Sequence, residues 1–131
     1  MNILLADPHS HTRLGLEMLL NREPGVVIAG SVADGTSLLA LAQTTHPDLI
    51  ILEAALPGLP LEQLVSELRA KNPKVQIISL CNDTVEDISL SATEYFCIKK
   101  SYPPAVLLAL FRALRKRADT FEENGHHLPR R

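Results

Sequence analysis

The sequence predicts an α/β fold in which a parallel β-sheet is covered by helices on both faces. Two observations predict it: short apolar runs of strand length recur along the 131 residues, and amphipathic stretches of helical length separate them. The apolar runs are nearly continuous rather than alternating, as expected for strands that are buried on both faces. Strands that alternate with helices join through right-handed crossovers, which gives a doubly wound domain.

The predicted elements follow one another in a regular order. The apolar runs are bounded by turn residues and lie at 3–6, 26–32, 49–52, 75–80 and 95–98. The predicted helices carry apolar side chains at helical spacing, and they lie at 12–21, 37–45, 61–71, 84–93 and 104–117. The pattern is weakest at 84–93. Residues 118–131 are polar and aperiodic and contain a glycine and a proline, so we expect a tail or the start of a linker after a domain at 1–117.

Length and composition narrow the class of protein. A chain of 131 residues with 46% hydrophobic and 21% charged residues suits one globular domain. Its net charge of −2 gives no general attraction to nucleic acid or membrane surfaces, so neither is expected as a direct partner. We see no signal peptide and no apolar run of membrane-spanning length, which favours a cytoplasmic protein. Cys81 and Cys97 are too few for a disulfide framework and lack metal-ligand spacing.

Polar residues at the ends of the predicted strands are the candidate site. In an open α/β sheet, ligands bind beyond the carboxyl ends of the strands. Asp7 follows the first strand, Glu53 the third and Lys99 the fifth. Taken singly, these are a turn residue, a solvated strand end and a surface lysine. Together they indicate a crevice that could bind a cation or orient a phosphoryl group.

Several segments carry a family resemblance. ILLADPH, RLGLEMLL, VADGTSLL, HPDLIILEAALPG and FCIKKS resemble, in order, the segments of response-regulator receiver domains of two-component systems. The closest variety is the one that precedes a LuxR/FixJ-type DNA-binding domain, and the resemblance covers roughly 1–117. It implies a flavodoxin-like (βα)5 fold with strand order 2-1-3-4-5 and a signalling role rather than an enzyme.

The resemblance also assigns site positions. In the family, an aspartate ending the third strand accepts a phosphoryl group from a histidine kinase, and two acids after the first strand help to bind Mg²⁺. A Ser or Thr ends the fourth strand and a lysine ends the fifth. Here the acceptor position falls on Glu53, the acid pair on Asp7 and Pro8, the hydroxyl position on Cys81 and the lysine on Lys99. Only Asp7 and Lys99 match the family.

The departures predict a degenerate phosphorylation site. Glu53 moves the carboxylate outward by about 1.5 Å, which is large against the positioning that phosphoryl transfer needs. Pro8 removes a carboxylate, so Mg²⁺ is expected to bind weakly and no cofactor is expected. Cys81 offers a weak thiol donor in place of a hydroxyl. We therefore predict a pseudo-receiver without phosphorylation, in which Glu53 contacts Lys99 directly.

The resemblance places the output face at the fourth helix, fifth strand and fifth helix. Phe96 falls at the aromatic position whose movement reports phosphorylation in the family, although a core phenylalanine explains it equally well. The stretch 81–99 is about one helical turn shorter than the family norm, so the fourth helix is expected to be short, displaced or partly unwound. We expect a protein partner or a homodimer contact at this face. The last helix offers Leu107, Leu110 and Leu114 for packing or contact.

Two alternatives stay open. One is a working Mg²⁺-dependent phosphorelay receiver that uses Glu53 or another acid. The other is a flavodoxin-like enzyme or small-ligand binder, which is disfavoured because the loop DPHSHT has no glycine to let a backbone cradle a phosphate. DNA binding would belong to an output domain that is absent from this chain.

Overall fold

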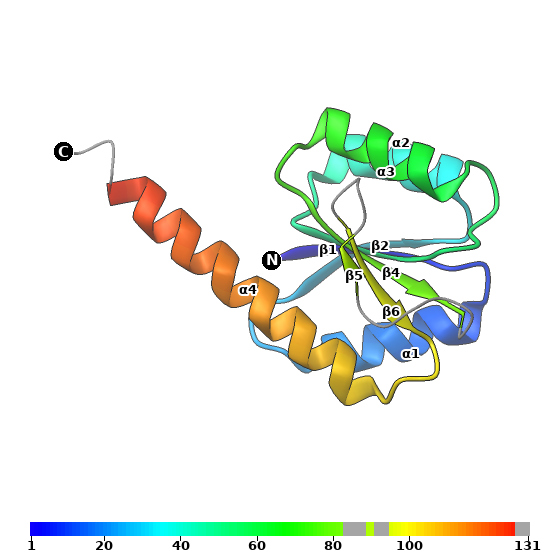
Figure 1. The fold of residues 1–131 in the computed structure, drawn as a ribbon, viewed down its shortest axis with the longest axis horizontal. Helices are drawn as coiled ribbons and strands as arrows, with labels where there is room; N and C mark the ends of the chain where they lie inside the picture. Colours follow the sequence, from blue (N-terminus) through cyan, green and yellow to red (C-terminus); the bar gives the residue numbers. More distant parts are fainter. Residues whose placement is uncertain (83–88, 91–94, 128–131) are drawn as a thin grey trace. The chain divides into compact units, whose positions relative to one another are not determined.

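The chain forms two compact units, Met1–Ser101 and Tyr102–Arg131. The computed structural model describes residues 1–82, 89–90 and 95–127. The first unit contains the β-sheet with α1, α2 and α3, and the second contains the long helix α4 (Figure 1). The candidate site residues at the strand ends all belong to the first unit.

The strands of the first unit form one sheet in the order β2-β1-β3-β4-β6-β5. Their bounds are β1 Asn2–Ala6, β2 Val27–Val32, β3 Leu49–Glu53, β4 Gln76–Cys81, β5 Ser89–Leu90 and β6 Phe96–Lys99. Neighbouring strands from β2 to β6 are parallel, and β5 is antiparallel to β6. The predicted fifth strand is β6. The five parallel strands therefore lie in the predicted order 2-1-3-4-5, and the flavodoxin-like fold is confirmed.

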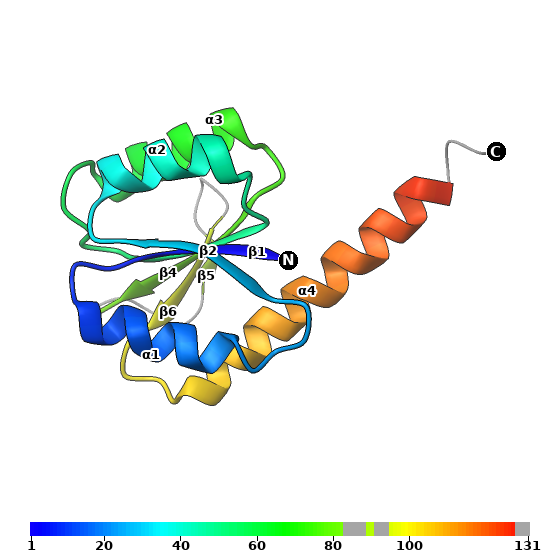
Figure 2. The same cartoon turned by 180° about the vertical axis from the view of Figure 1, so that it is seen from behind.

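Helices cover both faces of the sheet. α1 (Ser10–Leu20) lies on one face, and α2 (Gly35–Thr45) and α3 (Leu61–Lys71) lie on the other (Figures 1 and 2). The core on the α2–α3 face includes Leu4, Ala6, Ile50, Leu52 and Ile77. Because side chains alternate along a strand, the odd-numbered residues of β1 and β3 face α1. Burial on both faces explains why the apolar runs are continuous.

The start of α2 is capped and tied to the loop that follows β3. Asp34 is the N-cap, and its carboxylate accepts the Ser37 backbone N–H at 2.7 Å. That hydrogen bond lowers the pKa of Asp34, so its contribution to stability is lost as the pH falls through this lowered pKa. The Gly35 N–H donates to the Pro57 carbonyl at 2.8 Å. These contacts hold the loop after Glu53 against the helix.

A side chain at Gly58 in this loop is expected to strain the backbone. Its φ is +114°, and an added Cβ would lie 3.3 Å from the backbone nitrogen of Gly35. We expect Gly58→Ala to lower the free energy of unfolding by about 1–3 kcal/mol, measured by urea denaturation. Gly15→Ala is the control, because nothing lies within 4 Å of a Cβ there. Within helix α1 it should stabilise by about 0.5–1 kcal/mol; equal losses in both variants would contradict the argument.

Two predicted elements need correction. The helix expected at 84–93 is wrong at Ser89–Leu90, which form β5, and its other residues lie outside the described part of the chain. The helix expected to end at 117 continues instead, because α4 spans Pro104–His127. No proline interrupts the sequence between Pro104 and Pro129, so the backbone can continue helical hydrogen bonding through the stretch expected to be an irregular tail.

Candidate functional site

The predicted site residues lie at the carboxyl edge of the sheet but on two different faces. On β1 and β3, Ala6 and Leu52 belong to the α2–α3 core, so the next residues, Asp7 and Glu53, turn toward the α1 face. On β4, Ile77 belongs to the α2–α3 core, so Cys81 lies on the α2–α3 face. Backbone hydrogen bonds continue past the strand ends at this edge, and one of them runs from the Ala54 N–H to the Leu80 carbonyl at 2.8 Å.

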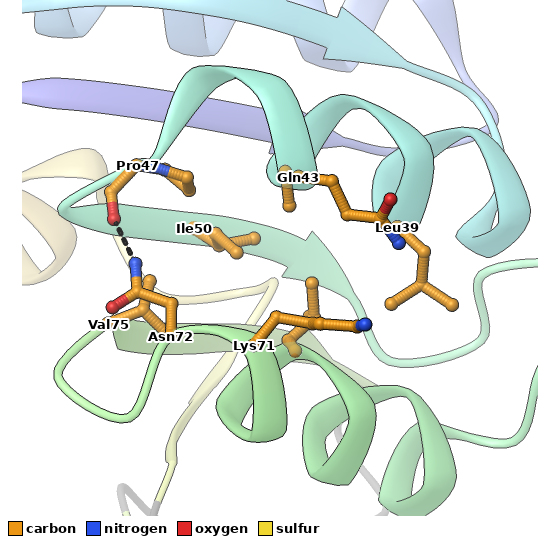
Figure 3. Close-up of a pocket in the computed structure, with 9 residues that line it drawn as sticks. Leu39, Gln43, Pro47, Ile50, Lys71, Asn72 and Val75 are labelled. Atoms are coloured by element: carbon orange, nitrogen blue, oxygen red, sulfur yellow. Dashed lines mark hydrogen bonds between the residues drawn. The ribbon is translucent and has the colours of Figure 1, made fainter.

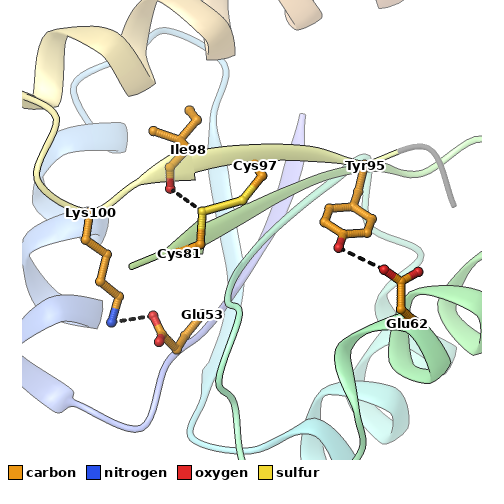
Figure 4. The surroundings of a disulfide bond; sticks show 7 residues. All are labelled: Glu53, Glu62, Cys81, Tyr95, Cys97, Ile98 and Lys100. Carbon is orange, nitrogen blue, oxygen red and sulfur yellow. Dashed lines mark hydrogen bonds and ion pairs between the residues drawn. A yellow bond between two sulfur atoms is a disulfide. The ribbon is translucent and has the colours of Figure 1, made fainter. Parts of the chain in front are cut away.

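An ion pair joins the buried Glu53 at the end of β3 to the exposed Lys100 directly after β6. The Lys100 ammonium contacts Glu53 Oε2 (Figure 4). The Glu53 side chain is 6% exposed and that of Lys100 is 35% exposed. An anion this far from water needs a compensating cation, because desolvation of an isolated carboxylate is unfavourable. The pair therefore fixes where the Glu53 carboxylate points.

The ion pair of Glu53 is with Lys100, whereas the sequence predicted Lys99, and strand alternation explains the difference. Cys97 packs against the α2–α3 core, and Lys99 is two residues further along the same strand. Lys99 therefore continues the face opposite Glu53, whereas Lys100 follows on the α1 face. The register agrees, because Lys99 pairs with Cys81. The FCIKK segment supplies the expected ammonium, one residue later than the family position.

Asp7 is buried and only half satisfied. Its Oδ1 accepts the His9 backbone N–H at 2.8 Å and lies 3.1 Å from His9 Nδ1. Within the described residues, its Oδ2 is buried and has no hydrogen-bond partner. Arg13 donates to the Asp7 carbonyl at 2.5 Å, and Pro8 is exposed. Asp7 is thus an acid at the predicted place, without a second acid beside it in the sequence.

The two cysteines form a disulfide bond, which the sequence analysis did not anticipate. Cys81 on β4 is bonded to Cys97 on β6, and their Cα atoms lie 6.5 Å apart (Figure 4). Cys81 Sγ also lies 3.3 Å from the Ile98 carbonyl oxygen. The expectation of a thiol donor at the hydroxyl position is therefore wrong, because a disulfide sulfur carries no proton to donate.

Two aromatic residues flank the start of β6 on opposite sides. Tyr95 is buried in the α2–α3 core, and its hydroxyl donates to Glu62 Oε1 on α3 at 3.2 Å (Figure 4). Alternation places the half-buried Phe96 on the other face. Phe96 has no hydroxyl, whereas Tyr95, directly before β6, makes a polar side-chain contact with α3.

Comparison with known proteins identifies the family. Residues 3–112 match the response regulator receiver domain family. The chain belongs to this family. As a receiver domain it is a signalling module and not an enzyme.

Two curated relatives show the extent of the match. This receiver is 30% identical over 116 residues to the nitrate/nitrite response regulator NarL of Escherichia coli K12, which covers 85% of the chain and 53% of NarL. It is 32% identical over 129 residues to the probable transcriptional regulator ycf27 of Porphyridium aerugineum, which covers 95% of the chain and 52% of ycf27. The receiver therefore spans about half the length of these relatives.

Solved structures show the same fold. The isolated REC domain of RcsB from Salmonella enterica serovar Typhimurium superimposes with a TM-score of 0.74 at 21% identity, covering 88% of both chains. A LuxR-family two-component response regulator from Aurantimonas sp. gives 0.72 at 22% identity, covering 88% of this receiver and 85% of that chain. At this level of identity, the likenesses show the fold of the receiver and not the function of its site.

The Mg²⁺ site of the family does not fit the residues present. Magnesium needs near-octahedral oxygen ligands at short distances. In this receiver the Glu53 carboxylate is engaged by an ammonium, and the second acid position is an exposed proline. Asp7 keeps one buried oxygen, Oδ2, without a hydrogen-bond partner among the described residues. Among the described residues, no group of three or more His, Cys, Asp or Glu side chains could hold a metal ion.

The receiver also has a small hollow between α2 and α3, remote from Glu53. It is lined by mainly apolar side chains, including Leu39, Ile50 and Val75, and Asn72 Nδ2 donates to the Pro47 carbonyl at 2.9 Å beside it (Figure 3). It has room for about one water molecule, so it does not support the alternative of a small-ligand binder.

None of the described helices is long and apolar enough to span a membrane.

Proposed function

We propose that this chain is a pseudo-receiver, which signals without phosphorylation because an internal ion pair occupies its acceptor position. The observation that carries the proposal is the contact between the buried Glu53 carboxylate and the Lys100 ammonium. An ammonium at this carboxylate supplies the positive charge that a phosphorylation site draws from a bound cation. The receiver thereby holds one arrangement of its β3 and β6 ends permanently.

The surroundings of Glu53 also disfavour phosphoryl transfer. An attacking carboxylate oxygen must reach phosphorus in line, and the Glu53 residue is only 5% exposed. Cys81 stands at the hydroxyl position, carries no hydroxyl and is bonded to Cys97. Pro8 supplies no carboxylate for a metal. Lys99, at the family's lysine position, continues the opposite face of the sheet. The burial of Glu53, the disulfide at Cys81 and the missing carboxylate at Pro8 act on different parts of the same reaction, so repairing one of them should not restore it.

Family members dimerise and interact with histidine kinases, and we propose that this receiver contacts a protein partner or a second copy of itself. The proposed contact involves the segments that align in sequence with the family's fourth helix, fifth strand and fifth helix, which are residues 84–93, β6 and α4. Most of 84–93 lies outside the described residues. Because the curated relatives are about twice as long and include transcriptional regulators, we further propose that the receiver controls a DNA-binding output domain.

The decisive experiment is intact mass spectrometry after incubation with acetyl phosphate and Mg²⁺. The wild-type receiver is expected to stay unmodified. The matched variant, Pro8→Asp/Glu53→Asp with Cys81→Thr, restores the family residues at three positions and is expected to gain one phosphoryl group. A labelled wild type would refute the proposal. The variant alone becoming labelled would show that these substitutions disabled the site.

One observation favours the alternative of a working phosphorelay receiver. Asp7 Oδ2 is buried without a hydrogen-bond partner among the described residues, as expected of an oxygen that awaits a cation. The same labelling experiment decides the case, because residual phosphorylation at Glu53 or Asp7 would appear as a mass increase that Asp7→Asn abolishes. Omission of Mg²⁺ is the control for this arm.

A further inference from the structure

The disulfide of this receiver links two hydrogen-bonded strands at the edge that carries the ion pair. Cys81 is the last residue of β4, and Cys97 lies on the neighbouring strand β6. In the strand register Cys81 is opposite Lys99 and Cys97 is opposite Ser79, so the bond runs diagonally. Their Cα separation of 6.5 Å is within the range of disulfides. A bond here fixes the sliding of β6 against β4.

The disulfide is connected to Glu53 by a short chain of contacts. The Lys100 N–H donates to the carbonyl of Cys81 at 2.8 Å. The side chain of the same Lys100 pairs with Glu53. A shift of the Cys81 backbone therefore moves the anchor of the lysine that holds the acceptor-position carboxylate. No described residue needs to intervene between the sulfur bridge and the ion pair.

We propose that Cys81 and Cys97 form a reversible redox-modification site, whose oxidation by a low-molecular-weight disulfide such as glutathione disulfide sets the position of Lys100. The proposal goes beyond the absence of phosphorylation and does not depend on it.

The exchange follows from the burial of the two sulfurs. Cys97 is half-buried whereas Cys81 is 3% exposed, so Cys97 is the sulfur that solvent reaches first. Its thiolate attacks glutathione disulfide, which forms a mixed disulfide and releases one glutathione thiolate. The Cys81 thiolate then attacks the Cys97 sulfur and releases the second glutathione. The protein loses two protons and two electrons, and the oxidant becomes two thiols.

The first test equilibrates the full chain in buffers of graded reduced-to-oxidised glutathione ratio, blocks free thiols with N-ethylmaleimide, and reads intact mass. We expect reversible conversion between dithiol and disulfide without denaturant. Cys81→Ala should accumulate one glutathione on Cys97, and Cys97→Ala should gain at least fivefold less. Equal adducts on the two variants would overturn the order of attack. A wild-type bond that reduces only in denaturant would overturn the reversible site.

The second test asks whether the bond controls Lys100. Amide hydrogen exchange of Lys100 is measured by NMR in the oxidised and reduced wild type, with Cys81→Ala/Cys97→Ala treated identically as the control. We expect at least a tenfold difference at Lys100 between the two wild-type states and none in the control. Equal exchange in both wild-type states would overturn the coupling. A reduced protein that loses its native NMR spectrum would show a purely structural bond.

Discussion

Replacing Lys100 with methionine is expected to lower the free energy of unfolding by about 2–3 kcal/mol. Methionine keeps much of the length and apolar surface of lysine but leaves the Glu53 carboxylate buried without its cation. Breaking a fully buried pair costs about 3–5 kcal/mol, and we reduce that figure because Lys100 is 35% exposed and partly screened by water. Urea denaturation monitored by circular dichroism measures the loss.

Double-mutant cycles separate this pair from a general effect of charge. Glu53→Gln combined with Lys100→Met should cost less than the sum of the two single variants, by about 1–2 kcal/mol, because neither partner is left as an isolated buried charge. The matched cycle uses Lys99→Met with Glu53→Gln, and its coupling should stay below about 0.5 kcal/mol. A larger coupling to Lys99 than to Lys100 would contradict the arrangement in Figure 4.

Removing the disulfide with Cys81→Ala/Cys97→Ala is expected to produce the largest stability change. The cysteines are 16 residues apart in the chain, and a closed loop of this length stabilises by about 3 kcal/mol in the chain-entropy description. For a domain of this size that corresponds to a melting temperature lower by roughly 10 °C. Thermal unfolding without reductant measures the difference between the variant and the oxidised wild type.

The same comparison under reductant is the control for packing. With dithiothreitol present, the wild type loses its cross-link. The remaining difference in the free energy of unfolding between wild type and variant then reflects only the packing of the two sulfur atoms that the variant lacks. We expect that difference to fall to about 1 kcal/mol. A gap that stays at its oxidised size under full reduction would mean that the variant destabilises through packing and not through the bond.

The strands of the receiver were predictable because each one is marked by a short run of consecutive apolar residues. Runs such as Leu49–Glu53 are apolar at consecutive positions, and strands buried on both faces impose that composition. The order of the strands in the sheet came from the family resemblance, since periodicity alone does not say which strand pairs with which. The place of Glu53 at the end of β3 was also predictable, because the apolar run stops there, although its burial was not.

Contacts that depend on register were not predictable in the same way. Choosing between Lys99 and Lys100 requires knowing which face of the sheet each residue of β6 points to. The available signal was alternation forward from the apolar Ile98, which places Lys100 on the same face as Ile98. The disulfide depends on how far β6 slides along β4, which no single-strand pattern contains. The contact between Tyr95 and Glu62 joins residues 33 apart, and neither has a local signature. The weak pattern at 84–93 did not distinguish a helix from the edge strand at Ser89–Leu90.

The length of α4 has a mechanical consequence. The family match ends at residue 112 whereas the helix continues to His127, so 127 − 112 gives 15 further residues. At about 1.5 Å per residue these add roughly 22 Å of rod. A flexible coil of that length would only tether whatever follows it, because a change of orientation at one end is not transmitted to the other. An unbroken helix acts as a lever, so a tilt of a few degrees at its base becomes a displacement of an ångström or more at its tip.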